Sequence, residues 1–190
     1  EFIKGINADL DLFALRYILG IYESNRPPSY VALWLSFSAT QSQTCHFISK
    51  MINTSNLTQL YIPACIKDQM ILENITKKAL RNSWIEYRKP ELVALLYIAM
   101  GNASKVSKLY QSSGDAARAN FFKKDFTQEK NRKSVIKNAY SSLSNHKYDM
   151  AAGLFIAAGD MSSAIAIIME KIKNPLLALL VLRLKEKSLD

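Results

Sequence analysis

The sequence predicts an all-α protein, an α-solenoid of helical hairpins in a single domain that is a fragment of a larger protein. Apolar residues recur at helical spacing in almost every segment, and the 190 residues contain no sustained two-residue alternation of a strand. Short turns in which glycine precedes Asn or Asp separate successive helices, at Gly101-Asn102 and Gly159-Asp160. The residues around these two turns resemble each other, as is typical of repeat proteins.

Residues 1–89 are expected to form the less regular helical part. Amphipathic patterns predict helices over residues 10–22, 30–37 and 43–52, and a polar loop over residues 53–58. The next helix is expected to begin at Pro63, because proline fits the first turn of a helix. Its predicted apolar face consists of Ile66, Met70, Ile75, Leu80 and Trp84.

Residues 90–190 are expected to form the helical-hairpin repeats. The predicted helices cover residues 90–100, 104–111, 115–122, 128–143, 147–158, 161–172 and 175–187. Segments 96–104 and 154–162 align with five of nine residues identical. A recurring hairpin of this kind buries its apolar face against its neighbours, which favours a solenoid. Two unrelated turns that share common capping chemistry would also explain the match.

The composition is that of an ordinary globular protein, with 49% hydrophobic residues, 6 Gly and 5 Pro, and it excludes a disordered or collagen-like chain. The two cysteines are too few for a secreted disulfide framework, so a reducing, cytoplasmic setting is expected. The longest apolar runs, residues 92–100 and 176–182, are far shorter than the ~18 residues that a membrane-spanning helix needs. The chain starts with Glu1 rather than Met, which suggests an excised fragment.

No catalytic, cofactor-binding or metal-binding residues are predicted. The two histidines are His46 and His146, and His146 has Asp149 nearby but no nucleophile elbow. Cys45 and His46 are adjacent, so on a helix they point in different directions, and no second ligand pair follows. Glycine-rich phosphate loops and dinucleotide fingerprints are absent from the sequence. An enzyme is therefore not expected.

The positive charge is concentrated in one region. Residues 77–147 contain 15 Lys or Arg and 5 Asp or Glu, within a chain of net charge +9. The candidate partner-binding residues are Lys130, Lys133 and Lys137, which share one face of the helix predicted over residues 128–143. The predicted apolar stripe of that helix consists of Val135, Ile136, Ala139, Tyr140 and Leu143. A solvated lysine face without a partner is the alternative interpretation.

Arg132 falls near this apolar stripe, where a long cationic side chain is expected to snorkel or to find a carboxylate partner. The aromatic residues of the basic region are spaced as core residues, rather than interleaved with the cations as in a nucleic-acid surface. A protein partner is therefore favoured over nucleic acid.

A family resemblance is carried by several short motifs in a conserved order. They are Ala32-Leu33-Trp34, Ser38-Ala39-Thr40-Gln41, Tyr97-Ile98-Ala99-Met100, Asp125-Phe126, Arg132-Lys133, Lys137-Asn138-Ala139-Tyr140, Leu143, Tyr148, Ala151-Ala152, Phe155, Gly159, Ala164 and the apolar helix from Leu176 to Leu184. In this order and spacing, residues 32–186 resemble the C-terminal helical region of the RAVE-complex large subunit and the DmX-like (rabconnectin) proteins. The chain departs from the family at Gly101-Asn102, where lysines are usual, and at Asn131, where Trp is usual.

The resemblance implies a non-enzymatic scaffold that promotes assembly of the vacuolar proton-translocating ATPase through protein contacts. The implied partners are peripheral-sector and stalk subunits of that ATPase and other RAVE-type subunits, with no cofactor and no small-molecule substrate. The implied location is cytoplasmic and peripheral to endomembranes, through these partners. A membrane-coat or trafficking scaffold built of similar hairpins is the alternative, and a basic nucleic-acid-binding module is a third.

Overall fold

The structure is a computed structural model that describes residues 64, 66 and 68–186. These residues form helices joined by short connections, and no strand occurs among them. The all-α prediction is therefore confirmed for this part of the chain, whereas the regular stacking of a solenoid stays a prediction. The helices expected within residues 10–52, the loop over residues 53–58 and the start at Pro63 lie outside the described residues.

The chain divides into two compact units, Glu1–Ser83 and Trp84–Asp190, and helix α4 (Gln69–Tyr87) runs from the first into the second. The predicted boundary at residue 89 remains a prediction. Helix α4 begins only after Asp68, whose carboxylate accepts a hydrogen bond of 2.9 Å from the Ile71 amide. Its buried face consists of Leu72, Ile75, Thr76, Ala79, Leu80 and Ser83.

The predicted core position of Met70 is wrong, because its side chain is 64% exposed. At about 100° per residue, Met70 lies roughly 200° from Leu72 around the axis of α4, and Leu72 is fully buried. The predicted apolar face is confirmed at Ile75 and Leu80, which are buried on α4, whereas Ile66 is buried but lies before the helix begins.

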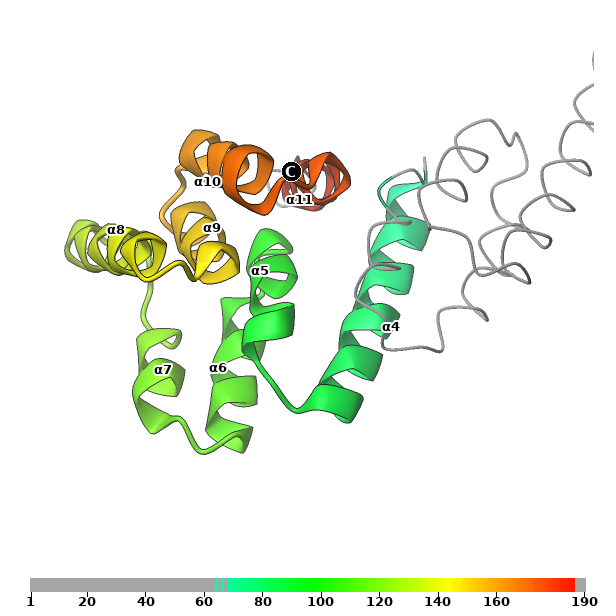
Figure 1. The fold of residues 1–190 in the computed structure, drawn as a ribbon. Coiled ribbons are helices and arrows are strands. Elements are labelled where there is room, and N and C mark those ends of the chain that lie inside the picture. Colours follow the sequence, from blue (N-terminus) through cyan, green and yellow to red (C-terminus); the bar gives the residue numbers. More distant parts are fainter. Residues whose placement is uncertain (1–63, 65, 67, 187–190) are drawn as a thin grey trace, which may run out of the picture. The chain divides into compact units, whose positions relative to one another are not determined.

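The second unit contains the helices predicted for residues 90–187, with bounds that differ by no more than one residue at any end when α10 and η2 are taken together. They are α5 (Glu91–Ala99), α6 (Ala103–Ser112), α7 (Ala116–Phe121), α8 (Glu129–Ser144), α9 (Tyr148–Ala157), α10 (Met161–Ile167), the π-helical η2 (Ile168–Ile172) and α11 (Pro175–Glu186). Figure 1 shows α9 between α8 on one side and α5 on the other, with α10 beside it.

One helix was predicted over residues 161–172, and the structure replaces it by α10 followed by the wider turn of η2. The segment ends at Lys173, whose φ of 57° is left-handed, and the Asn174 amide donates to the Ile168 carbonyl at 3.2 Å. The side chain of Asn174 then caps α11 by accepting from the Leu177 amide at 2.9 Å. The predicted proline start of α11 is confirmed at Pro175.

The core of the second unit is the contact between α5 and α9. Seven consecutive residues of α5 (93–99) and six of α9 (151–156) are buried, so both helices are enclosed on all sides. Gly153 allows their close approach, since a Cβ atom at this position would lie 3.2 Å from Ile98 Cδ1 and 3.5 Å from Leu95 Cα. Large side chains such as Phe155, which is 1% exposed, fill the remaining space.

The two glycine turns predicted from the sequence are confirmed as helix caps of one type. Gly101 and Gly159 have φ values of 71° and 82°. After the second turn, the Gly159 amide donates to Ile156 and the Asp160 amide to Phe155, which is the Schellman pattern. Asp160 then caps α10 through the Ser163 amide at 3.0 Å. The turn at residues 101–102 has the same bonds, with Asn102 accepting from the Lys105 amide at 3.2 Å.

Two further turns between predicted helices have this geometry. Gly114-Asp115 follows the same pattern, with φ of 84° at the glycine and a side-chain cap from Asp115 to the Arg118 amide. At the turn between α8 and α9, His146 takes the left-handed position with φ of 57°, and Lys147 takes the cap position without a side-chain hydrogen bond. This fourth turn therefore has neither the glycine nor the Asn or Asp that favour this geometry at the other three turns.

We expect Gly159→Val to lower the free energy of unfolding by about 1 to 3 kcal/mol, because a β-branched residue is strained at positive φ. No atom lies within 4 Å of a Cβ built at Gly159, so backbone strain is the only expected cost. Gly159→Asn is the matched control, since Asn tolerates this conformation and should cost less than Val. Urea unfolding monitored by circular dichroism would test this, and equal stability of the Val variant and the wild type would contradict it.

Candidate functional site: the outer surface of α8 and the adjacent groove

Helix α8 is the most exposed helix of the second unit. Of its 16 residues only Val135 and Ala139 are buried, and its main packing partner is α9. Ile136 and Leu143 are partly exposed, so the predicted apolar stripe is confirmed at its centre and open at its edge. The side of α8 that faces away from α9 is therefore accessible (Figure 1).

The structure brings the three candidate lysines together on this accessible side. At about 100° per residue, Lys130, Lys133 and Lys137 fall within an arc of about 60°, and all three are exposed. Lys133 Nζ lies 3.6 Å from Glu129 Oε1, but both side chains are largely exposed, at 76% and 67%. An ion pair this exposed is worth little, so the lysine face, Lys130, Lys133 and Lys137, keeps its positive potential.

Arg132 anchors the buried side of α8, although its partner differs from the expected carboxylate. Its Nε donates a hydrogen bond of 2.9 Å to the carbonyl of Ala158, the residue that ends α9. The carbonyls in the last turn of a helix have no partner within the helix, and they carry the negative end of its dipole. A helix end therefore satisfies the guanidinium, and α8 is joined to α9 at this point.

Tyr140 was predicted to lie in the apolar stripe, and this is wrong because its side chain is 56% exposed. The ring forms a T-shaped pair with the ring of Phe155, with ring centroids 5.2 Å apart and an interplanar angle of 87°. The exposed part of Tyr140 lies on the side of α8 that carries the lysine face. Tyr140 lies seven residues after Lys133, about 20° away around the helix. This spacing alone indicates that Tyr140 shares the exposed side of α8 with the lysines.

The loop before α8 is held by polar contacts around Asp125. The Asp125 carboxylate accepts hydrogen bonds from the hydroxyl and the amide of Thr127, at 2.7 and 3.0 Å, and these bonds lower its pKa. Asn131 donates its side-chain amide to the Asp125 carbonyl at 2.8 Å. This hydrogen bond joins the first turn of α8 to the loop before it.

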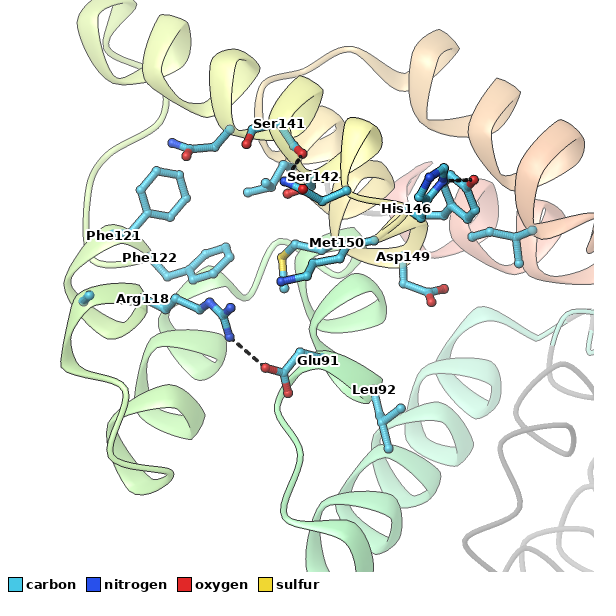
Figure 2. Close-up of a pocket in the computed structure, with 17 residues that line it drawn as sticks. Glu91, Leu92, Arg118, Phe121, Phe122, Ser141, Ser142, His146, Asp149 and Met150 are labelled. Carbon is cyan, nitrogen blue, oxygen red and sulfur yellow. Dashed lines mark hydrogen bonds and ion pairs between the residues drawn. The ribbon is translucent and has the colours of Figure 1, made fainter.

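A groove of about 770 Å³ opens on the flank of the C-terminal half of α8 (Figure 2). Its walls come from the start of α5, from α7, from the end of α8 and from the start of α9. Phe121, Met150 and Leu154 supply apolar atoms, whereas Ser141 and Ser142 supply hydroxyl groups. Charged residues also line the groove, namely Glu91, Arg118, Lys147 and Asp149, so it is mixed in character.

His146 and Lys147, the residues of the unusual fourth turn, both line this groove. His146 Nδ1 is 2.8 Å from the hydroxyl of Tyr148, so the imidazole is engaged in a local hydrogen bond. Asp149 is exposed as a whole residue, yet its carboxyl group is partly enclosed, and this burial raises its pKa. His146 is thus oriented by its neighbour Tyr148.

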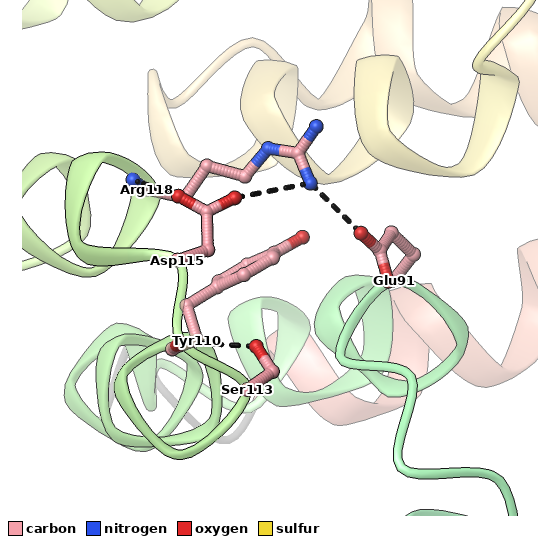
Figure 3. A network of polar contacts seen from close by, with 5 residues as sticks. All are labelled: Glu91, Tyr110, Ser113, Asp115 and Arg118. Carbon is pink, nitrogen blue, oxygen red and sulfur yellow. Dashed lines mark hydrogen bonds and ion pairs between the residues drawn. The ribbon is translucent and has the colours of Figure 1, made fainter.

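A polar network next to the groove joins α5 to α7 (Figure 3). Arg118 Nη1 lies 2.8 Å from Glu91 Oε1 and 3.4 Å from Asp115 Oδ2. The guanidinium also covers the ring of Tyr110, at 5.5 Å from its centroid. Tyr110 is 1% exposed and its hydroxyl has no hydrogen-bond partner among the described residues, while burial, and to a lesser degree Glu91, raise the pKa of the phenol above its usual value.

We expect Tyr110→Phe to be neutral or to stabilise the chain by up to about 1 kcal/mol, because a buried hydroxyl without a partner opposes folding. The ring stacks on Phe122 at 5.7 Å, and Phe keeps this contact. Tyr110→Leu is the control and should destabilise the chain through loss of the aromatic stack. Thermal unfolding measures both. A loss of more than about 1 kcal/mol for Phe would show that the hydroxyl is bonded.

The described residues also bear on two other features, a metal site and a membrane-spanning helix. Among residues 64, 66 and 68–186, no group of three or more His, Cys, Asp and Glu is arranged to hold a metal ion. The adjacent Cys45 and His46 lie outside these residues. Within the same part of the chain, every helix is too short or too polar to cross a membrane.

Several known proteins are similar to this chain. DmX-like protein 1 of Mus musculus is 29% identical over 136 residues, and the human DmX-like protein 1 is 28% identical over the same length. The "Regulator of V-ATPase in vacuolar membrane protein 1" of Schizosaccharomyces pombe is 27% identical over 131 residues. These matches cover 72%, 72% and 66% of this chain, respectively. The chain covers only 4% of the DmX-like proteins and 10% of the S. pombe protein.

The family described as "RAVE protein 1 C terminal" matches residues 7–190, which is nearly the whole chain. The resemblance inferred from the short motifs is thereby confirmed. The segment with this match includes α8, its lysine face and the adjacent groove. This chain belongs to the RAVE protein 1 C-terminal family.

Proposed function

We propose that this chain is a protein-binding part of a factor that promotes assembly of the vacuolar proton-translocating ATPase. It acts without catalysis, as a helical scaffold that contacts peripheral-sector and stalk subunits of the ATPase and other RAVE-type subunits. It works in the cytoplasm, at the surface of endomembranes, and reaches the membrane only through its partners.

The observation that carries this proposal is the family match over residues 7–190. It is supported by the S. pombe relative, whose name describes a regulator of the V-ATPase in the vacuolar membrane. The described residues add a helical body with an accessible basic helix, which suits protein recognition better than chemistry on a small substrate.

The lysine face of α8 is the proposed contact for acidic surfaces on these partners. Lys130 and Lys137 have no ion-pair partner among the described residues, and Lys133 has only the exposed Glu129. Exposed charges of this kind act mainly on the rate of association, since they steer a partner of opposite charge before contact. We therefore expect the three lysines to contribute more to association than to the lifetime of the complex.

The experiment that tests the function is capture of the full-length protein that contains this chain from its native cells. Capture would be done at moderate salt with nuclease present, and co-purifying proteins would be identified by mass spectrometry. Recovery of peripheral-sector subunits of the vacuolar ATPase is the expected result. Reproducible recovery of vesicle-coat proteins without ATPase subunits would instead support a trafficking scaffold, and RNA-binding partners would support a nucleic-acid module.

Replacing Lys130, Lys133 and Lys137 together by Glu is expected to slow association with the captured subunits about tenfold or more at low salt. The helix content should stay unchanged, because all three side chains are exposed. The effect should shrink as salt rises, since salt screens exposed charges. Association rates from surface binding measurements at several salt concentrations would test this.

A matched control carries the same change in net charge at another place. Lys105 and Lys108 on α6 and Lys171 on η2 are also exposed, and their joint replacement by Glu should affect association far less. Equal slowing by the two triple variants would mean that net charge acts, rather than the lysine face. Unchanged association of the α8 variant at every salt concentration would exclude this face as the contact.

A further inference from the structure

We propose that Tyr140 and the lysine face of α8 together form a docking surface for an acidic protein segment that carries a large apolar side chain. Tyr140 is the anchor at one end of this surface, and the lysines extend the surface with positive charge towards the start of α8. The inference rests on the proposed protein-binding function, and it adds a residue, a geometry and a chemical description of the partner segment.

The position of Tyr140 continues the lysine face. It is three residues after Lys137 and seven after Lys133, so all of them project from one side of α8. The three lysines and Tyr140 together cover an arc of about 80° at ~100° per residue. Opposite this arc lie the buried Val135 and Ala139, which fix α8 on the rest of the unit. The docking surface therefore points away from the core.

The ring of Tyr140 is held in place before any partner arrives. The ring forms a T-shaped pair with the ring of Phe155, with centroids 5.2 Å apart. Phe155 lies on α9 and is itself only 1% exposed. A Tyr side chain has few rotatable bonds, and this contact restricts it further, so little additional ordering is needed on binding. The 56% of the side chain that is exposed is then available for contact.

The surface lacks internal charge compensation. Glu129 is the one carboxylate of α8, and its distance of 3.6 Å from Lys133, with both groups exposed, makes it a weak competitor. Carboxylates of a partner can therefore reach Lys130 and Lys137 directly. The aromatic ring adds apolar contact area, and Tyr is among the residues that most often dominate the affinity of an interface.

A protein segment fits these features better than a nucleic acid. Single-stranded nucleic acids are bound by several aromatic side chains on which successive bases stack, and Tyr140 is the only aromatic residue of α8. One exposed ring at the end of a row of lysines instead matches one apolar side chain next to a row of carboxylates. The expected partner is therefore an acidic segment with a Leu- or Phe-sized side chain beside its carboxylates.

The test uses the whole 190-residue chain and a short synthetic peptide rich in Asp and Glu around one Leu-Phe pair. Two control peptides have the apolar pair replaced by Ser-Ser or the acidic residues replaced by Lys. Binding is measured by fluorescence anisotropy at several salt concentrations, and the contact is located from backbone amide shifts in NMR spectra. The variants are Tyr140→Ala, Tyr140→Phe and the triple Lys→Glu change, and their melting temperatures verify that they fold.

We expect the acidic Leu-Phe peptide to bind and both controls to bind at least about tenfold more weakly. Tyr140→Ala should raise the dissociation constant about tenfold or more without changing its salt dependence, whereas Tyr140→Phe should change it less than about threefold. The triple Lys→Glu change should weaken binding and flatten the salt dependence. The shifted amides should cluster at residues 130–140.

Several results would overturn the inference. They are no binding of the acidic Leu-Phe peptide, unchanged binding by Tyr140→Ala, and shifts that cluster at Ser141, Lys147 and Met150, which would locate the contact in the groove. Tighter binding of a single-stranded oligonucleotide with the same dependence on Tyr140 would also overturn the choice of a protein partner. The capture experiment is separate: peptide docking on α8 without recovery of ATPase subunits would leave this surface intact and refute the proposed function.

Discussion

Replacing Phe155 by Ala is expected to lower the free energy of unfolding by about 3 to 5 kcal/mol. The side chain is 1% exposed and lies in α9, the helix that contacts α5, α8 and α10. Removal of the ring leaves a cavity that neighbouring helices close only in part, and the edge-to-face contact with Tyr140 at 5.2 Å is lost as well. Since single domains are stable by about 5 to 15 kcal/mol, this loss is a large share of the total.

Urea unfolding followed by far-ultraviolet circular dichroism measures this loss. Leu182→Ala is the control: Leu182 lies on α11, is 38% exposed, and should cost far less because less apolar surface is removed from the interior. Phe155→Leu keeps most of the side-chain volume but removes the ring. It therefore distinguishes the cost of the cavity from the cost of losing the ring contact with Tyr140. A Phe155→Ala cost of about 1 kcal/mol or less would show that the core tolerates the cavity.

The helical part of the second unit could be predicted because its local signals agree with one another. Glycine followed by Asn or Asp marks where one helix ends and the next begins. The glycine adopts the left-handed conformation, and the Asn or Asp side chain caps the next helix. Gly114-Asp115 carries the same signal. The turn at His146-Lys147 follows from the predicted helix bounds, but its left-handed geometry could not be predicted from residue types, because neither residue has the favourable local chemistry.

The wrong predictions concern which side chains of a helix are buried. Burial depends on the neighbouring helices, and the sequence of one helix does not identify these neighbours. Met70 and Tyr140 are both apolar enough for a core, yet both are exposed. For Arg132, the sequence indicated the need for a partner, and the partner is the backbone carbonyl of Ala158 in the next helix. A search for carboxylates in the sequence could not find a backbone acceptor 26 residues away.

The positive charge of the candidate site could be predicted from the sequence, whereas the groove beside α8 could not. The spacing of the three lysines predicted a shared face, and the structure places them on the most exposed helix of the unit. The groove is assembled from α5, α7, α8 and α9, so its existence depends on tertiary packing. His146 and Lys147 lie in this groove and in the one turn that lacks favourable residues. Their replacement by Gly and Asp would restore the pattern of the other turns.

The close approach of α5 and α9 gives the second large prediction, in which Gly153→Val lowers the free energy of unfolding by about 2 to 3 kcal/mol. The first added atom, Cβ, would already lie 3.2 Å from Ile98 Cδ1 and 3.5 Å from Leu95 Cα. The two further methyl groups of Val have no free space, because α5 is buried over residues 93–99 and its backbone cannot shift without opening the core.

Gly153→Ala is the matched control that isolates the effect of size. Its single carbon requires only that the Ile98 side chain move by a few tenths of an ångström, and Ala gains about 1 kcal/mol over Gly in helix propensity. The Ala variant should therefore lie within about 1 kcal/mol of the wild type, while Val should fall well below it, as measured by urea unfolding. Equal stability of the Val and Ala variants would mean that α5 and α9 can separate without loss, so that their contact would not be the core of this unit.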